Sequence, residues 1–533
     1  MNKKDLLFIT ISSILLTLSF PPFPFGFLAY FSLVFLIIAL EKSFVTQSFS
    51  FDDSTSWVKV NPKGLRYDFS TPKPGRLGRA FKLGYVFGLI SNTLLLFWIG
   101  YAHIPGAIVA ILALSFYTAI LFLVYAQIQR FLQEKTIFLL PFLWVGMEYG
   151  RSLGEIAFPW LNLAYTQTYY VHLIQYSSFT GVWGVSFWVA LLNVLVYLGI
   201  KNFSEGSRQN AGNDRKKLLG LSAIFIILIV IPYIYGMAVI PKEKEKGEVK
   251  IALLQGDIDP EVKWDERFLG YNFDVYTKMS REVGKEKVDL LIWPETACPC
   301  YLIAEPGYFK MIQSLSESLN TEILTGTNHY KYLGESLYVF YNSAFLFKPY
   351  GEFPTIYSKI HLVPGSERLP FSDKVRIMRK LQLGQADFSP GNELVVFNNH
   401  KGKFAVLICF ESIFPDLVRR FVIKGADFLV NITNDAWWGK TSGPFQHSQI
   451  AVFRAIENRI SIARCANSGV SMFIDPYGRT YQKTKIFVRE TVIGEIPIKK
   501  ETTFYTLYGD WLGKGCFFVS ILFFILSFFI KKV

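Results

Sequence analysis

The sequence predicts a two-part fold, with a multi-pass helical membrane domain and a layered α/β domain outside the cytoplasm. Three observations support it. The 533 residues are 51% hydrophobic and 17% aromatic, more than an average soluble protein contains. Long apolar runs fall before residue 240 and at the end of the chain, whereas the region between alternates short apolar strands with helical patterns. Lysine and arginine gather in only some of the connecting loops.

Eight apolar runs are candidates for membrane-spanning helices. Seven of them define a transmembrane domain over residues 1–240, and the last belongs to a C-terminal helix over 512–533. The runs cover residues 6–20, 27–40, 83–99, 106–129, 136–149, 179–200, 217–239 and 516–530. The Pro-rich segment between the first two predicts a tight helical hairpin. The N-terminal segment resembles a signal peptide, but no small-residue cleavage site follows it, so we expect it to be retained.

The net charge of +13 does not indicate nucleic-acid binding, because of where the charge lies. Basic residues crowd the loop 42–82, which we expect to be flexible, and the loop 201–217. With eight spans, the positive-inside rule places both loops and both termini in the cytoplasm. The polar region 241–511 then lies on the opposite face, which in a bacterial inner membrane is the periplasm. Five cysteines are few for such a region, so disulfides do not organise it.

Residues 249–500 predict a layered α/β domain, joined to the membrane part by a charged linker at 241–248. The predicted strands are VKIALLQ, VDLLIWPE, EILTGTN, FAVLICFES, ADFLVNITND and GVSMFIDP. Helical patterns separate several of them, at 267–284, 308–319 and 447–460. Such alternation is typical of sheets covered by helices, and strand ends are where these folds place their sites.

Three reactive side chains lie at strand or loop ends in this domain. Glu295 ends the run LLIWPE, Lys359 lies in YSKIHLVPGSE, and Cys409 directly follows FAVLI. Taken singly, each has an ordinary structural interpretation, as a cap, a solvated amine or a small core residue. Together they supply what a cysteine nucleophile requires: a base to remove its proton and a cation at the developing oxyanion.

The motifs around these residues resemble the nitrilase superfamily, whose catalytic set is a Glu, a Lys and a Cys in this chain order. The flanking apolar runs narrow the resemblance to the apolipoprotein N-acyltransferase family of the bacterial inner membrane, and further segments match it at 158–167, 253–264, 431–460 and 468–479. The resemblance covers nearly the whole chain and implies a nitrilase-like α-β-β-α sandwich as the catalytic domain. One departure is HLVPGSE at 361–367, where the family usually has HLVPFGE.

The resemblance also implies a ping-pong acyl transfer. Cys409 would attack an ester carbonyl of a phospholipid and form a thioester, with Glu295 as the general base. Lys359 and a backbone N–H near Phe410 would hold the oxyanion. The N-terminal α-amine of a diacylglyceryl-cysteine on a lipoprotein would then attack the thioester and form an amide.

Further residues receive supporting roles from the same resemblance. Glu367 and Glu411 would orient Lys359 and the base, with simple structural salt bridges as the alternative. Trp264 would close over the substrate, with a packed core indole as the alternative.

The expected partners are a phospholipid acyl donor, a diacylglyceryl apolipoprotein acceptor and the bilayer, and we expect a monomer that binds no nucleic acid. No cofactor or metal is expected, because the six histidines lack ligand spacing with cysteines or carboxylates and no Gly-rich phosphate loop follows a strand. Two alternatives stay open: a membrane-tethered nitrilase or amidase that hydrolyses a C–N bond, and an inactive scaffold that binds lipoproteins. The complete set of Glu295, Lys359 and Cys409 disfavours the scaffold.

Overall fold

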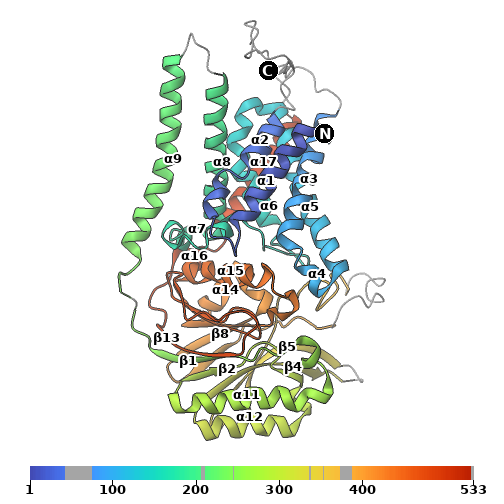
Figure 1. Ribbon diagram of the computed structural model, residues 1–533, viewed down its shortest axis with the longest axis vertical. Helices are drawn as coiled ribbons and strands as arrows, with labels where there is room; N and C mark the ends of the chain where they lie inside the picture. The colour runs from blue at the N-terminus through green and yellow to red at the C-terminus, as the bar shows by residue number, and fades with distance from the viewer. Residues whose placement is uncertain are drawn as a thin grey trace.

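The computed structural model places a helical bundle at one end of the molecule and a two-sheet sandwich at the other (Figure 1). It describes residues 1–41, 75–205, 211–243, 245–334, 338–351, 353–372 and 387–529. The predicted loop 42–82 lies outside the described residues over 42–74. Its last residues, 76–82, are not a loop but the first turns of helix α3.

Each predicted apolar run overlaps a helix. The bundle comprises α1 (Lys3–Ser19), α2 (Val34–Glu41), α3 (Arg76–Leu96), α4 (Ile99–Ala102), α5 (Ile104–Leu132), α6 (Leu140–Gly150), α7 (Ser177–Thr180), α8 (Val182–Glu205), α9 (Ala211–Val239) and α17 (Trp511–Phe529). The second run is broken, because its first residues form a short 3₁₀ helix, Gly26–Tyr30, before the eight-residue α2.

Within the described residues, four segments are long and apolar enough to cross a membrane: Ile104–Gly150, Val182–Ser204, Asp214–Val239 and Trp511–Phe529. The most hydrophobic stretch of the third is not buried inside the protein at all, and that of the last is only 11% buried. Exposed apolar surface on helices of this length is typical of membrane-spanning segments. The predicted membrane protein is confirmed in this form.

Small residues allow the bundle to pack closely. Gly84 and Gly88, one turn apart on α3, face α5, and a Cβ at either position would lie 2.8 Å from its backbone, at Thr118 O and Ser115 Cα respectively. The pair therefore forms a Gly-x-x-x-Gly contact of the type that membrane helices use. Gly146 likewise allows α6 to pack closely against α17, since a Cβ added at this position would lie 2.6 Å from Ser520 Oγ. The C-terminal helix thus returns into the bundle.

The sandwich contains two mixed sheets. The first has the order β13-β1-β2-β4-β5-β6, with β3 also on β4, and the second has the order β12-β11-β10-β9-β8-β7. Their bounds are β1 (Val249–Gln255), β2 (Leu290–Ile292), β3 (Cys298–Tyr301), β4 (Glu322–Tyr332), β5 (Tyr338–Phe347), β6 (Thr355–Ser358), β7 (Val396–Asn399), β8 (Gly402–Ile408), β9 (Phe428–Thr433), β10 (Ser461–Ala466), β11 (Met472–Ile474), β12 (Thr480–Tyr481) and β13 (Glu490–Ile496). Strands β1, β2 and β4 are parallel, as are β8, β9 and β10.

Helices cover both outer faces of the sandwich. Alternate residues of β1 show the layering, because Ile251 and Leu253 join the core between the sheets, whereas Ala252 and Leu254 pack beneath α11 (Leu269–Val283) and α12 (Pro306–Leu319). The other face carries α14 (Pro415–Ile423) and α15 (Gly443–Asn458), between the sheets and the bundle (Figure 1). The short helices α10 (Pro260–Lys263) and α16 (Phe504–Tyr508) complete the described set. The architecture is the predicted α-β-β-α sandwich.

Candidate active site

Strand ends bring the three predicted residues together. Glu295 lies three residues after β2, Lys359 directly follows β6, and Cys409 directly follows β8. All three are buried, with side chains or residues at most 8% exposed. Lys359 Nζ lies 3.5 Å from Glu295 Oε1, and both groups act on the pKa of Cys409. Two parallel strands from different sheets and an antiparallel one therefore converge on a single site.

Glu295 is held by groups on both of its carboxylate oxygens. Asn342 Nδ2 donates to Oε1 at 2.9 Å, and the backbone N–H of Asn434 donates to Oε2 at 2.9 Å. The backbone carbonyl of Glu295 accepts from Lys263 Nζ at 3.0 Å. These bonds fix the carboxylate in position beside Lys359.

Lys359 sits between two carboxylates. Its Nζ donates to Glu367 Oε1 at 2.9 Å, and Asn342 Nδ2 donates to the same oxygen at 2.9 Å. Burial lowers the pKa of Lys359, but Glu367 and Glu295 outweigh it and hold the pKa above its ordinary value. The ammonium is therefore a permanent positive charge in a buried site. Glu367, predicted to orient Lys359, touches it directly.

Cys409 adopts a backbone conformation that is unfavourable for its residue type. Its φ is +52°, in the left-handed region that residues with a Cβ rarely occupy. Such strain marks positions where a tight turn presents a side chain for chemistry. Burial and then Glu295 raise the pKa of the Cys409 thiol well above its ordinary value, against the opposite effect of Lys359. The resting thiol is therefore protonated at neutral pH.

Glu411 joins the segments that carry Lys359 and Cys409. Its Oε1 accepts from Tyr357 Oη at 2.6 Å and from the backbone N–H of Ile360 at 2.7 Å, and its Oε2 accepts from Ile408 N–H at 2.8 Å. The carboxylate thus bonds neighbours of Lys359 and Cys409 rather than their side chains. Burial raises the pKa of Glu411 to about 7.

The other two predicted residues occupy different surroundings. Phe410 is 4% exposed, and its ring packs 5.9 Å from that of Phe158 in the loop between α6 and α7. The indole of Trp264 is 42% exposed and follows α10, whose Lys263 contacts Glu295. Trp264 is therefore not packed in a core, and the residue that reaches Glu295 is its neighbour Lys263.

Aromatic residues connect this site to the bundle. Trp160, in the loop between α6 and α7, stacks on His447 of α15 with ring centroids 5.2 Å apart. Trp438 packs 4.6 Å from Trp98, which lies at the end of α3. Gln446 accepts from the indole N–H groups of Trp98 and Trp160, at 3.3 and 2.9 Å. The site therefore lies near the junction of the two parts of the molecule.

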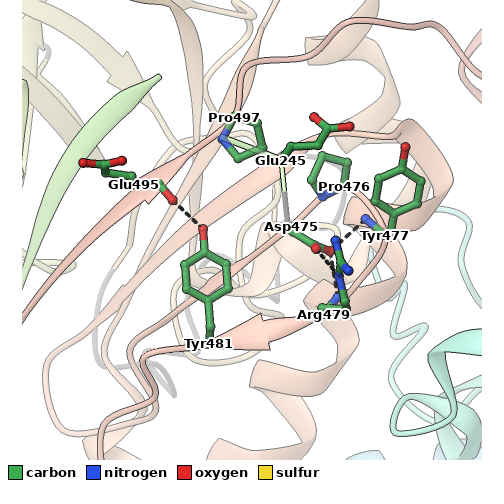
Figure 2. A pocket seen from close by; sticks show the side chains of 8 residues that line it. All are labelled: Glu245, Asp475, Pro476, Tyr477, Arg479, Tyr481, Glu495 and Pro497. Carbon is green, nitrogen blue, oxygen red and sulfur yellow. Dashed lines mark hydrogen bonds and ion pairs between the residues drawn. The ribbon is translucent and has the colours of Figure 1, made fainter. Parts of the chain in front are cut away.

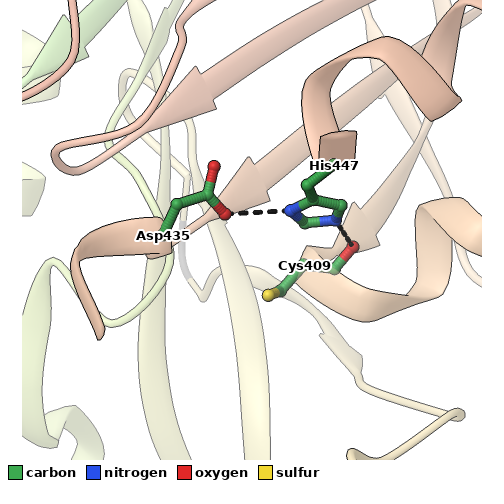
Figure 3. A group of neighbouring side chains, drawn as sticks. All are labelled: Cys409, Asp435 and His447. Carbon is green, nitrogen blue, oxygen red and sulfur yellow. Dashed lines mark hydrogen bonds and ion pairs between the residues drawn. The ribbon is translucent and has the colours of Figure 1, made fainter. Parts of the chain in front are cut away.

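A further cluster lies beneath the nucleophile. Ligand atoms of Cys409, Asp435 and His447 lie within 4.8 Å of one another, and all three residues are buried (Figure 3). Spacing along the sequence does not reveal this group. Asp435 is already paired with Arg464 at 2.8 Å and with His447 at 2.9 Å, so hydrogen bonds account for its carboxylate without a metal ion.

A shallow pocket elsewhere has a structural explanation. It lies beside the linker and is lined by Glu245, Asp475, Arg479 and Tyr481, among others (Figure 2). Arg479 pairs with Asp475 and donates to the carbonyl of Pro241 at 2.8 Å, and Tyr481 donates to Glu495 O at 2.8 Å. Its lining contains none of the predicted site residues, and the bond from Arg479 to Pro241 anchors the linker to the sandwich.

Comparison with known proteins assigns a class to this fold and site. Residues 250–504 match the carbon-nitrogen hydrolase family model, and residues 65–195 match the model described as the apolipoprotein N-acyltransferase N-terminal domain. The chain is thus a carbon-nitrogen hydrolase fold attached to a helical domain of a second known type.

Curated relatives narrow the class to one family. An apolipoprotein N-acyltransferase of Geobacter metallireducens is 37% identical over 86% of this chain and 88% of the relative. That of Chlorobaculum tepidum is 31% identical over 86% of this chain and 89% of its own length. The chain belongs to the apolipoprotein N-acyltransferase family and is an enzyme, as the motifs predict. A solved amidase from Nesterenkonia sp. matches 48% of the chain and 93% of its own, at 18% identity and a TM-score of 0.36.

Several residues of the site are not identifiable from the sequence by the same reasoning. Asn342 lies inside β5, and Asn434 contributes a backbone N–H that any residue except proline supplies. Lys263 bonds a carbonyl 32 positions away. The only local signal is that Asn342 and Asn434 are amides in or directly after apolar strands.

Proposed function

We propose that this enzyme transfers a fatty acyl chain from a phospholipid, through a thioester on Cys409, to the N-terminal α-amine of a diacylglyceryl-cysteine in lipoproteins. The observation that carries the proposal is the buried juxtaposition of Glu295, Lys359 and Cys409 in a carbon-nitrogen hydrolase fold next to an apolar helical bundle. Family membership supports the lipid donor and the lipoprotein acceptor.

In the first half-reaction, Glu295 removes the proton of the Cys409 thiol as the sulfur attacks the ester carbonyl. A base is needed because the raised pKa keeps the resting thiol neutral. The ammonium of Lys359 and the N–H of Phe410 stabilise the oxyanion. The S–C bond forms, the ester C–O bond breaks, and the lysophospholipid leaves with the proton that Glu295 had accepted.

In the second half-reaction, the lipoprotein amine attacks the thioester carbonyl. Glu295 accepts a proton from the amine, the C–N bond forms, the C–S bond breaks, and the proton passes to the Cys409 sulfur. Lys359 and the Phe410 N–H again hold the oxyanion. Trp264, which is exposed and follows Lys263, covers the bound substrate.

We place the chain in a bacterial inner membrane as a monomer, with eight spans and the sandwich in the periplasm. In Figure 1 the N-terminus, the end of α8 and the start of α9 lie at the end of the bundle away from the sandwich. Basic residues gather in the sequence at these same places, with Lys3 and Lys4 at the chain start and Lys201 and Arg215–Lys217 near the α8–α9 connection. The positive-inside rule assigns that end to the cytoplasm.

The test is the intact mass of the full-length protein after incubation with vesicles of one defined diacyl phospholipid, before and after hydroxylamine. We expect a fatty-acyl adduct that hydroxylamine removes, absent in Cys409→Ala and present in the matched control Cys300→Ser. A folded protein that forms no adduct but releases ammonia from a small amide would instead support the membrane-tethered amidase. An adduct that persists in Cys409→Ala would overturn the assignment of the nucleophile.

A further inference from the structure

The carbonyl of Cys409 accepts hydrogen bonds from two buried side chains that the mechanism above does not use. His447 Nε2 lies 3.1 Å from this oxygen, and Ser412 Oγ donates to it at 3.0 Å. Both side chains belong to fully buried residues. Figure 3 shows the imidazole directed at the carbonyl oxygen, while the sulfur of Cys409 points away from that contact.

The imidazole is fixed from its other side. His447 Nδ1 lies 2.9 Å from Asp435 Oδ1 and 3.1 Å from Arg464 Nη2. Asp435 also accepts from Arg464 at 2.8 Å and from Thr433 Oγ1 at 2.8 Å. Because a carbonyl oxygen only accepts, the bond to Cys409 requires a hydrogen on Nε2 of the ring. With the hydrogen on Nε2 of a neutral ring, Nδ1 accepts from Arg464 Nη2, and Asp435, which accepts from the same Arg464 group, keeps that donor in place.

Fixing this carbonyl also fixes a proposed oxyanion donor. The Cys409 carbonyl and the Phe410 N–H belong to one peptide unit, which is planar and, when trans, points the two groups in opposite directions. Cys409 has a φ of +52°, so its peptide occupies a conformation that requires support from its surroundings. Two hydrogen bonds to the oxygen supply that support.

We propose that His447, held by Asp435 and Arg464, is a positioning residue that orients the Cys409–Phe410 peptide so that the Phe410 N–H faces the developing oxyanion. The inference rests on the proposed acyl transfer and deepens it. His447 touches neither the thiol proton nor the substrate in this role. Its ring stacks on Trp160, so the orientation of the peptide also depends on the loop that joins α6 to α7.

The test compares two reactions of the same thiol. Acylation by phospholipid passes through an oxyanion, whereas alkylation by iodoacetamide does not, and both require a folded site. We expect His447→Phe, which keeps a ring against Trp160, to slow acylation by about 10-fold to 100-fold while alkylation stays within about threefold of the wild type. His447→Gln, whose amide can donate from the position of Nε2, should recover most of the loss.

The opposite outcomes are distinct. Acylation by His447→Phe within about twofold of the wild type would overturn the inference, as would a parallel loss of acylation and alkylation, which indicates a merely structural role. If His447→Phe does not fold, Ser412→Ala provides the test. It removes one of the two hydrogen bonds to the Cys409 carbonyl and leaves the imidazole of His447 unchanged. It should slow acylation but not alkylation. A wild type that forms no thioester would refute the proposed function itself.

Discussion

At the scale of single residues, the charge on Glu367 controls how far the activity extends to high pH. Glu367 and Glu295 together hold the pKa of Lys359 above its ordinary value, while burial acts to lower it. Glu367→Gln removes one of these charges, so the pKa of Lys359 falls. Because the ammonium form is the active one, acylation should be lost at lower pH than in the wild type. The measurement is the acylation rate from pH 6 to 10, a range in which the wild type keeps its ammonium. A Glu367→Gln variant whose rate does not fall relative to the wild type at the alkaline end would contradict the role of Glu367.

Lys263 provides a second prediction at this scale. Burial lowers the pKa of its amine to about 7, against the opposing effect of Glu295. The unfolded chain, with an ordinary pKa near 10.4, binds the proton more tightly, so this residue destabilises the fold fully below pH 7 and progressively less as the pH rises toward 10.

We therefore expect Lys263→Met to raise the melting temperature relative to the wild type more at pH 6 than at pH 9. Lys278→Met, a change on the exposed part of α11, is the control and should show no such dependence. If the difference in melting temperature between Lys263→Met and the wild type grew with rising pH, the predicted direction of the pH dependence would be wrong.

Single residues also show what the sequence can reveal. Glu295, Lys359 and Cys409 are recognisable because each reactive group follows an apolar segment and stands in a characteristic motif. Lys263 and Asp435 are not, because their partners lie far along the chain, at Glu295 for one and at Arg464 and His447 for the other. Contacts that depend on how two sheets face each other leave no periodic trace in the sequence.

At the scale of elements, strands made of apolar residues are predictable from the sequence, whereas strands interrupted by proline or by a charged residue are not. The run VKIALLQ matches β1 over its full length, whereas VDLLIWPE forms a strand only over Leu290–Ile292, since Pro294 lacks the N–H that a ladder needs. Strand β10 escapes prediction because its Arg464 is buried in a sheet, where Asp435 compensates the charge. Its Arg464 nevertheless contacts His447, which bonds the carbonyl of Cys409.

Helix α15 couples the bundle to the sandwich through Gln446, and this contact can be tested. Gln446→Leu leaves the buried indole N–H of Trp160 without its acceptor, which costs about 1–3 kcal/mol of folding free energy. We expect a lower melting temperature and slower acylation, because the next residue is His447. Gln449→Leu is the matched control, since Gln449 accepts from no indole in the described part of the chain. Equal melting temperatures for the two variants would rule out this coupling.

At the scale of the whole molecule, the direction of the chain through the membrane decides whether the proposed substrates reach the site. The described bundle exposes apolar faces on α9 and α17, and the described N-terminus, the end of α8 and the start of α9, which carry basic residues, lie at the end away from the sandwich. Each lysine or arginine that must cross the bilayer opposes the inverted orientation, so the asymmetry favours a sandwich in the periplasm. A sandwich in the cytoplasm would face neither exported lipoproteins nor the outer leaflet.

Reporter fusions at two positions test this orientation. Alkaline phosphatase, which folds only after export, should be active when fused after residue 245 and inactive when fused after residue 533. A green fluorescent protein that fluoresces only in the cytoplasm should show the reverse pattern at the same two positions. Active phosphatase at both positions would mean that the last span is missing, and phosphatase active only after residue 533 would mean that the whole chain is inverted. Only the inverted result would remove the periplasmic site, and the thioester on Cys409 would still be tested by its own experiment.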